Sequence, residues 1–190
     1  MGFLDALLGK RKLSGPAPDR LFALSTAYVD LEAAHGITTS GGAGIVFQQL
    51  ATGDFEQMVT DTAELLTSTG EETGTTSETH DDQFGYRWVV VRDADLEDLV
   101  VAVNTVSDGI QVGGYADRLL AAVFAFKDAH GTPLYLIYNF KRGSWYPFVP
   151  GPGDKERATE RELQLKAQIG ASLPIERELE RWFPLWGAPI

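Results

Sequence analysis

The carboxylates of Asp93, Asp95, Glu97 and Asp98 form a dense group of side chains that could donate and accept protons. A carboxylate pair can act as general acid and base when different surroundings separate the two pKa values. The apolar residues that follow recur at helical spacing, however, which places these four carboxylates at the start of a helix. Negative side chains stabilise that end of the helix dipole, so the pattern favours a structural role over an acidic active site.

Histidine and cysteine offer little to a metal ion or to nucleophilic catalysis. The chain has no cysteine, and its three histidines, His35, His80 and His130, are not spaced to share a metal ion. The glycine-flanked serine of hydrolases and the glycine patterns of nucleotide-binding folds are also missing. We therefore predict no catalytic residue, no metal site and no cofactor, and hence a protein that is not an enzyme.

Two further segments admit a binding role and a simpler structural one. Residues 41–44 read Gly-Gly-Ala-Gly before a strand-like run, whereas a phosphate loop precedes a helix, so we interpret them as a flexible turn. Residues 141–148 mix basic and aromatic side chains as single-stranded nucleic acid sites do, but two basic residues at a hairpin turn followed by aromatic residues alternating along a strand are the stronger explanation. The net charge of −11 repels phosphate, and we expect no nucleic acid partner.

The first twelve residues show an amphipathic pattern. Apolar side chains at helical spacing are followed by a basic cluster, and this candidate contact site comprises Phe3, Leu4, Leu7, Leu8, Lys10, Arg11 and Lys12. A helix this short is marginal in water and needs a surface to become ordered, either an anionic membrane or a protein; otherwise it stays disordered. We expect residues 1–18 to be a mobile arm and linker.

The densest apolar segment lies near the end of the sequence and holds two of the four tryptophans. Ile175, Leu179 and Trp182 share one face of an expected short helix that a proline ends. This spacing predicts that Trp182 packs in the core and that Trp186 lies nearer the surface. Exposed tryptophan is favoured at interfaces, which makes Trp186 a candidate partner-binding residue; docking of the whole segment on its own domain is the alternative.

The elements that position these residues follow from hydrophobic periodicity and turn residues. We expect helices over residues 26–35, capped by Ser25, from Asp54 to about 66, from Asp93 or Asp95 to about 112, and from Asp154 to about 171. Strands are expected over 45–50, over 84–90 with one buried face, and over 118–127, 133–141 and 145–149 as an antiparallel meander. Residues 67–82, with five acids and no base, are expected to form a solvated loop.

This order of elements lacks the regular alternation of a parallel sheet. It indicates one α+β domain over residues 19–190, with helices packed on a mainly antiparallel sheet. The absence of cysteine fits a reducing compartment, and no run approaches the roughly 20 apolar residues of a membrane helix. We therefore expect a cytoplasmic protein that works by binding.

Four segments stand in a distinctive order along the chain: MGFLDALLG at residues 1–9, LFAL at 21–24, KRGSWYPF at 141–148 and RWFPLWGAP at 181–189. Together they resemble the PspAB family, the PspA-associated proteins of actinobacteria and archaea. The resemblance implies a non-catalytic companion of a PspA-like protein in the response to envelope stress, with an HtpX-type membrane protease as a further partner. The N-terminal arm would then supply peripheral contact with the inner face of the membrane.

The order of elements is also similar to the YbjN and type III secretion chaperone fold, whose members often form homodimers. A secretion-chaperone-like dimer that holds an extended peptide is therefore one alternative function. A small enzyme with an acidic site around Asp93–Asp98 is another.

Overall fold

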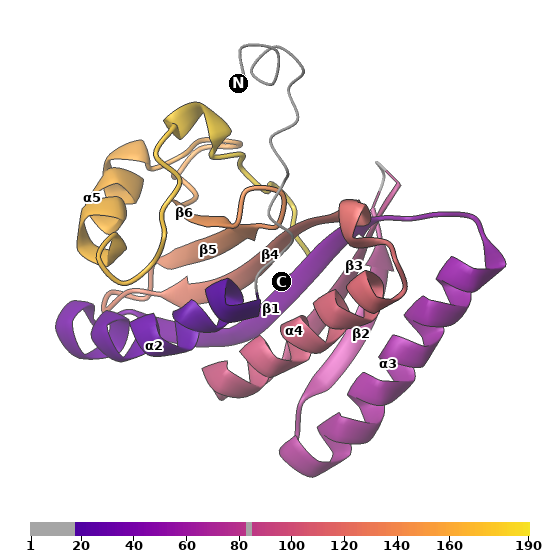
Figure 1. The fold of residues 1–190 in the computed structure, drawn as a ribbon. Helices are drawn as coiled ribbons and strands as arrows, with labels where there is room; N and C mark the ends of the chain where they lie inside the picture. The colour runs from indigo at the N-terminus through magenta and orange to yellow at the C-terminus, as the bar shows by residue number, and fades with distance from the viewer. Residues whose placement is uncertain (1–17, 83–84) are drawn as a thin grey trace, which may run out of the picture.

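The computed structural model describes residues 18–82 and 85–190 of the chain. In this part, four α-helices pack on a six-stranded antiparallel sheet, which confirms the α+β class. Helices α2, α4 and α3 lie side by side along one face of the sheet, and the yellow C-terminal segment lies on the other side (Figure 1).

The bounds of the elements are as follows. The helices are α2 (Pro18–His35), α3 (Gly53–Thr73), α4 (Leu96–Val112) and α5 (Thr159–Ile169), with short 3-10 turns η1 (Ala116–Arg118) and η2 (Leu179–Arg181). The strands are β1 (Thr38–Gln48), β2 (Thr76–Asp81), β3 (Tyr86–Arg92), β4 (Leu119–Lys127), β5 (Pro133–Asn139) and β6 (Ser144–Phe148). Across the sheet the order is β2-β3-β1-β4-β5-β6.

The sheet is buried on both faces except at β2. Strand residues that point toward the helices build the larger core with α2, α3, α4 and α5. The alternate residues build a second, smaller core on the opposite face: Val46, Trp88, Val90, Ala121, Val123, Ile137, Tyr146, Phe148 and Trp182. Strand β3 therefore buries Val89 and Val91 as well as Trp88 and Val90, and the expectation of one buried face is wrong because the C-terminal segment covers the other.

Helix α4 and the meander of β4, β5 and β6 confirm the sequence-based expectations most closely. The Asp95 carboxylate caps α4 by accepting a hydrogen bond from the Glu97 amide, and the helix ends at Gly113. Its apolar stripe faces the core along the whole length of the helix. The cap at Asp95 and the periodic apolar residues all lie in or next to the helix. The sequence of this segment is therefore enough to predict the helix without any distant residue.

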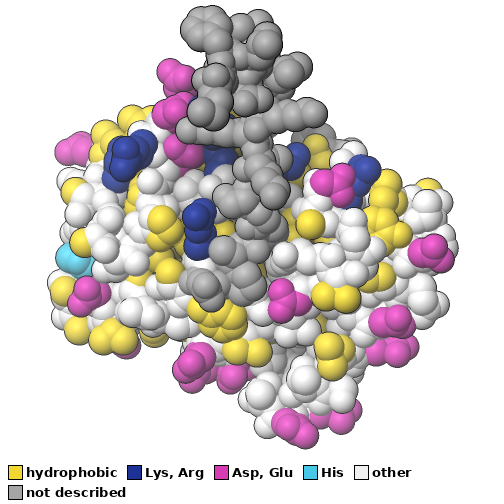
Figure 2. Space-filling model, in the orientation of Figure 1, with side chains coloured by type: hydrophobic (Ala, Val, Ile, Leu, Met, Phe, Trp, Pro, Cys, Tyr) yellow, Lys and Arg dark blue, Asp and Glu magenta, His cyan; other side chains and the backbone are white. Residues whose placement is uncertain are grey.

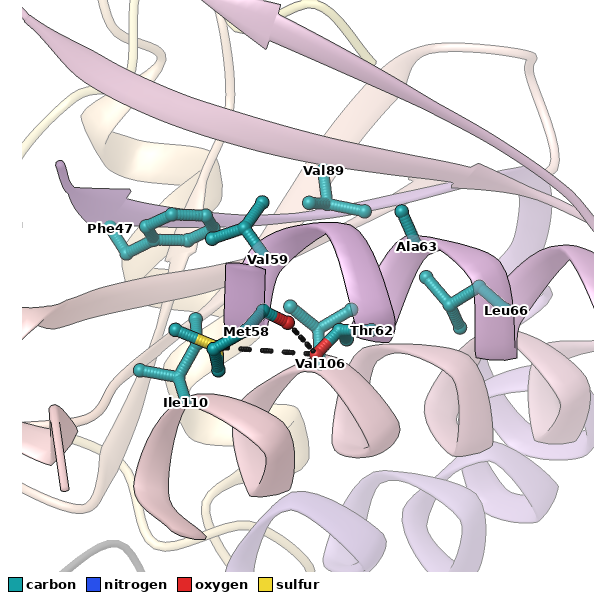
Figure 3. A pocket seen from close by; sticks show the side chains of 9 residues that line it. All are labelled: Phe47, Met58, Val59, Thr62, Ala63, Leu66, Val89, Val106 and Ile110. Carbon is teal, nitrogen blue, oxygen red and sulfur yellow. Dashed lines mark hydrogen bonds between the residues drawn. The ribbon is translucent and has the colours of Figure 1, made fainter. Parts of the chain in front are cut away.

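Helices α3 and α4 approach each other closely where Gly109 faces Thr62. A Cβ atom at position 109 would lie 2.5 Å from Thr62 Oγ1, so only glycine fits the crossing. The Thr62 hydroxyl donates a hydrogen bond of 2.8 Å to the Met58 carbonyl (Figure 3). A gap of about 10 Å³ beside this crossing is lined almost wholly by apolar side chains, which makes it a packing imperfection too small for a ligand.

Two helices begin elsewhere than expected. Helix α2 starts at Pro18 rather than after Ser25, because Leu21 and Leu24 extend the same buried face by two turns and proline suits the first helical position. Helix α5 starts at Thr159 and not at Asp154; its cap residue, Ala158, provides no side-chain hydrogen bond.

Residues 67–82 do not form the expected solvated loop. Helix α3 continues to Thr73 and stops at Gly74, whose φ of 91° and hydrogen bond to the Gly70 carbonyl end it. Strand β2 follows and pairs with β3 over its full length, from Thr76 opposite Arg92 to Asp81 opposite Arg87. All six β2 residues are exposed, so backbone pairing rather than apolar burial orders the strand. Composition alone could not predict that pairing.

Candidate functional site

Residues 182–190, which we call the strap, cross the second face of the sheet. Trp182 is buried and stacks on Tyr146 with 6.3 Å between the ring centroids. Trp186 meets Phe148 edge to face at 4.9 Å and is only partly buried. The prediction that Trp182 is a core residue and Trp186 lies nearer the surface is therefore confirmed. The strap docks on its own domain, and Trp186 still presents part of its ring at the surface.

The far end of the strap rests on two glycines of β1. Cβ atoms at Gly42 and Gly44 would come within 3.1 and 3.0 Å of the Ile190 side chain, so the strap approaches the strand more closely than a side chain there would allow. The Arg92 guanidinium adds a 3.4 Å hydrogen bond to the Pro189 carbonyl. Residues 41–44 are thus part of β1, and the interpretation as a flexible turn is wrong. Glycines two apart within a strand signal such a close approach.

Replacing Gly44 with alanine is expected to lower the free energy of unfolding by about 1 to 3 kcal/mol, because the new methyl group overpacks against Ile190. Chemical denaturation of Gly44→Ala, Ile190→Ala and the double variant measures this. The double variant should recover most of the free energy of unfolding that Gly44→Ala alone loses. Gly53→Ala is the control, since a Cβ there meets nothing within 4 Å. Strictly additive effects of Gly44→Ala and Ile190→Ala would contradict the contact.

A buried ion pair fixes the start of the strap. The Glu162 carboxylate accepts hydrogen bonds from Arg157 at 3.1 and 2.8 Å and from the Val149 amide at 2.9 Å. Arg157 also donates to the Trp182 carbonyl and lies over the Phe148 ring, 5.6 Å from its centroid. The ion pair therefore connects α5, the end of β6 and the strap.

Two further hydrogen bonds hold the same end of the strap. The Trp182 indole donates to the Glu176 carbonyl at 3.1 Å. The Tyr146 hydroxyl donates to the Phe183 carbonyl at 3.1 Å, and burial raises the pKa of Tyr146, which keeps the hydroxyl protonated. The Phe183 backbone is thereby fixed while its side chain stays in solvent.

An open groove of about 950 Å³ lies between the strap and the sheet. Its walls come from the start of β3, the end of β1, the start of β4 and the end of β5, together with β2 and the strap. The aromatic lining residues are Tyr86, Trp88, Tyr146, Phe183 and Trp186. Polar side chains at the groove include His80, Asp81, Asn139, Lys141 and Lys155. This mixture suits an apolar ligand or peptide with a polar edge.

The acidic group near α4 serves the fold. Asp93 accepts hydrogen bonds from the Asp95 amide at 2.8 Å and from the Thr75 hydroxyl at 2.7 Å, so it ties the segment before β2 to the start of α4. Burial raises the pKa of Asp98, and the negative charges of Asp93, Asp95 and Glu97 add to the shift. These contacts support the structural interpretation of the cluster, since Asp93 and Asp95 accept hydrogen bonds at the helix start and Glu97 and Asp98 lie in the first turn.

The other side chains singled out from the sequence do not converge. His35 ends α2, His80 lies in β2 and His130 lies in the turn between β4 and β5. Over residues 18–82 and 85–190, no three histidine or acidic side chains are grouped to hold a metal ion. Acidic and hydrophobic side chains are spread over the face seen in Figure 2 rather than collected at one place. The N-terminal contact residues, from Phe3 to Lys12, lie outside the part that the structure describes.

Sequence reasoning predicted Trp186 as a partner-binding residue but did not predict that the other lining residues converge. The lining residues come from segments spread between Val46 and Pro189, and Tyr86, Trp88 and Tyr146 look like ordinary core residues of their own strands. Within the described ranges, no helix is long and apolar enough to cross a membrane.

Comparison with known proteins gives one family. The model of PspAB, PspA associated protein B, matches residues 1–190 of the chain. No curated protein matches, and no solved structure matches. The similarity to the YbjN and type III secretion chaperone fold therefore stays a prediction.

Proposed function

Since the chain belongs to the PspA associated protein B family, we propose that it is a non-catalytic accessory protein that binds a PspA-like protein in the envelope-stress response of the cell. The observation that carries this proposal is the aromatic groove between the strap and the sheet. Trp, Tyr and Phe are the residue types enriched at the centres of protein interfaces. A cytoplasmic location belongs to the proposal and fits the absence of cysteine.

The rigidity of the groove supports a binding role. One wall is a sheet with both faces buried, and the other is a strap held at Trp182 by Arg157 and at Pro189 by Arg92. A site whose walls are already fixed loses little conformational entropy when a partner docks. Two aromatic side chains, Tyr86 and Phe183, stand partly in solvent at the groove and are available to a partner.

The N-terminal residues extend this proposal. Phe3, Leu4, Leu7 and Leu8 with Lys10, Arg11 and Lys12 would provide a second contact, either with the PspA-like protein or with the inner face of the membrane. An HtpX-type membrane protease is the further candidate partner. Both partners bring the protein to the membrane, where an amphipathic segment would add affinity.

Replacing Phe183 with alanine is expected to weaken binding to the PspA-like protein of the same host about tenfold or more, because the ring is an exposed anchor at the groove. The free energy of unfolding should change little, since the Phe183 carbonyl keeps its bond to Tyr146. Isothermal titration of the full chain with the purified PspA-like protein measures the dissociation constant. Parallel titration with an HtpX-type protease in detergent separates the two partners.

Leu65→Ala is the matched control for Phe183→Ala. The Leu65 side chain is 52% exposed and Phe183 is 58% exposed, but Leu65 lies on α3, away from the groove. Equal loss of affinity in both variants, or wild-type affinity in Phe183→Ala, would show that the groove is not the binding site. Phe3→Asp with Leu7→Asp tests the N-terminal contact in the same assay.

A further inference from the structure

The two edges of the sheet differ in whether another chain segment pairs with the edge strand. At the β6 edge, the Trp145 amide donates to the Pro174 carbonyl at 2.9 Å and the Glu176 amide donates to the Trp145 carbonyl at 2.8 Å. The chain segment around Ile175 therefore covers that edge. At the β2 edge, no segment of the described chain pairs with the outer side of the strand. One edge of the sheet is available to another strand.

Strand β2 also lacks several of the features that keep an edge from pairing. Its sequence, Thr-Ser-Glu-Thr-His-Asp, contains no proline and no lysine. Its register against β3 runs without a bulge from Thr76 to Asp81. Proline, lysine and bulges are common edge protections, and the acids that β2 does carry, Glu78 and Asp81, restrict its partners to an edge with complementary side chains.

The side chains of β2 identify that matching edge. Glu78 lies opposite Val90 and His80 lies opposite Trp88, so both point to the strap face of the sheet. Glu78 Oε1 and His80 Nε2 are 3.3 Å apart. A carboxylate and an imidazole that flank Thr79 symmetrically make the strand complementary to an antiparallel copy of itself, because each carboxylate then faces an imidazole N–H that can donate to it.

We propose that β2 pairs antiparallel with β2 of a second copy of this chain, about a twofold axis perpendicular to the sheet at Thr79. In this register Thr79 lies opposite the second copy's Thr79, and Glu78 lies opposite the second copy's His80. An axis at Glu78 would instead oppose two Glu78 carboxylates, and an axis at His80 would oppose Glu78 to Asp82. The axis at Thr79 is therefore favoured, because it places a carboxylate opposite an imidazole and opposes no Glu78 to another carboxylate.

The dimer joins two six-stranded sheets into one continuous sheet. Because the axis is perpendicular to the sheet, the strap faces of both copies lie on the same side. His80 lines the groove, so the two grooves open toward each other across the axis. The dimer does not depend on the proposed function, but it would offer a partner two adjacent sites.

The test uses the full chain, which contains no cysteine, so that single cysteines report unambiguously. Thr79→Cys should form an intermolecular disulfide in mild oxidant, since opposite residues of an antiparallel pair lie about 4.5 to 5.5 Å apart at Cα. Ser77→Cys is the control. It lies on the same strand, but its own copy in the dimer is displaced by about 13 Å along the strands, so it should stay uncrosslinked.

A charge-reversal series tests the register without a crosslink. Sedimentation equilibrium of the full chain should show a concentration-dependent dimer, and Glu78→Lys should raise its dissociation constant at least about tenfold by opposing lysine to histidine. The combination Glu78→Lys and His80→Glu should restore the wild-type constant. The β2 residues are exposed, so these changes leave folding intact, which the melting temperature checks.

Each outcome of these experiments either supports or overturns the β2 dimer. Crosslinking at position 79 but not 77, together with rescue by the double reversal, supports the β2 dimer. A monomer at every concentration, equal crosslinking at both positions, or a dimer indifferent to Glu78→Lys overturns it. A wild-type chain that stays monomeric and still binds the PspA-like protein would overturn this inference and leave the proposed function standing.

Discussion

Replacing Trp182 with alanine is expected to lower the free energy of unfolding by about 3 to 5 kcal/mol. The side chain is buried in the second core, stacks on Tyr146 and donates its indole N–H to the Glu176 carbonyl. Its removal leaves a cavity, an unpaired carbonyl and a detached strap. Chemical denaturation followed by circular dichroism measures the loss, which amounts to a large share of an ordinary domain's stability.

Trp186→Ala is the companion variant. The ring contacts Phe148 by one edge and is partly exposed, so its loss should cost about 1 to 2 kcal/mol. A partner that docks in the groove should lose affinity as well, because Trp186 forms part of the lining. If Trp186→Ala destabilised the fold as much as Trp182→Ala does, the strap would serve structure alone and the partner site would have to lie elsewhere.

The contrast between the two tryptophans could be predicted because it is local. Pro184 prevents a helix from continuing to Trp186 and leaves that tryptophan on irregular chain. The same kind of local signal specified α4, through its cap at Asp95 and its apolar period. The expected short helix is only the turn Leu179–Arg181, and Leu179 is 45% exposed, so the expected apolar face is wrong although Trp182 is buried.

The features that escaped prediction depend on contacts between distant segments. Strand β2 has a composition typical of a solvated loop, and it is ordered only because β3 offers a complete ladder of backbone partners. Gly42 and Gly44 suggest a turn until Ile190, about 150 residues later, is placed against them. The groove also depends on contacts between distant segments, because the strap that forms one wall crosses strands that are far from it in the sequence.

Replacing Arg157 with methionine is expected to lower the free energy of unfolding by about 3 to 5 kcal/mol, because it leaves the Glu162 carboxylate buried without a compensating charge. Glu162 is 1% exposed, and after the change only the Val149 amide would still donate to it. The Trp182 carbonyl loses its donor at the same time. The strap should loosen, which a shift of tryptophan fluorescence to longer wavelength would report alongside the denaturation curve.

The double variant Arg157→Met, Glu162→Gln separates the charge from the packing. Glutamine keeps an acceptor for the Val149 amide without a negative charge, so the double variant should be more stable than Arg157→Met alone, although one more residue has changed.

The exposed pair Arg181–Glu178 is the control. Its N–O distance is 2.7 Å, against 2.8 Å for Arg157–Glu162, but the Glu178 side chain is 55% exposed, and Glu178→Gln should cost less than about 1 kcal/mol. Arg157→Met and Glu178→Gln could instead lower the free energy of unfolding by the same amount. Burial would then not strengthen the Arg157–Glu162 pair, and aromatic packing on Tyr146 and Phe148 would hold the strap.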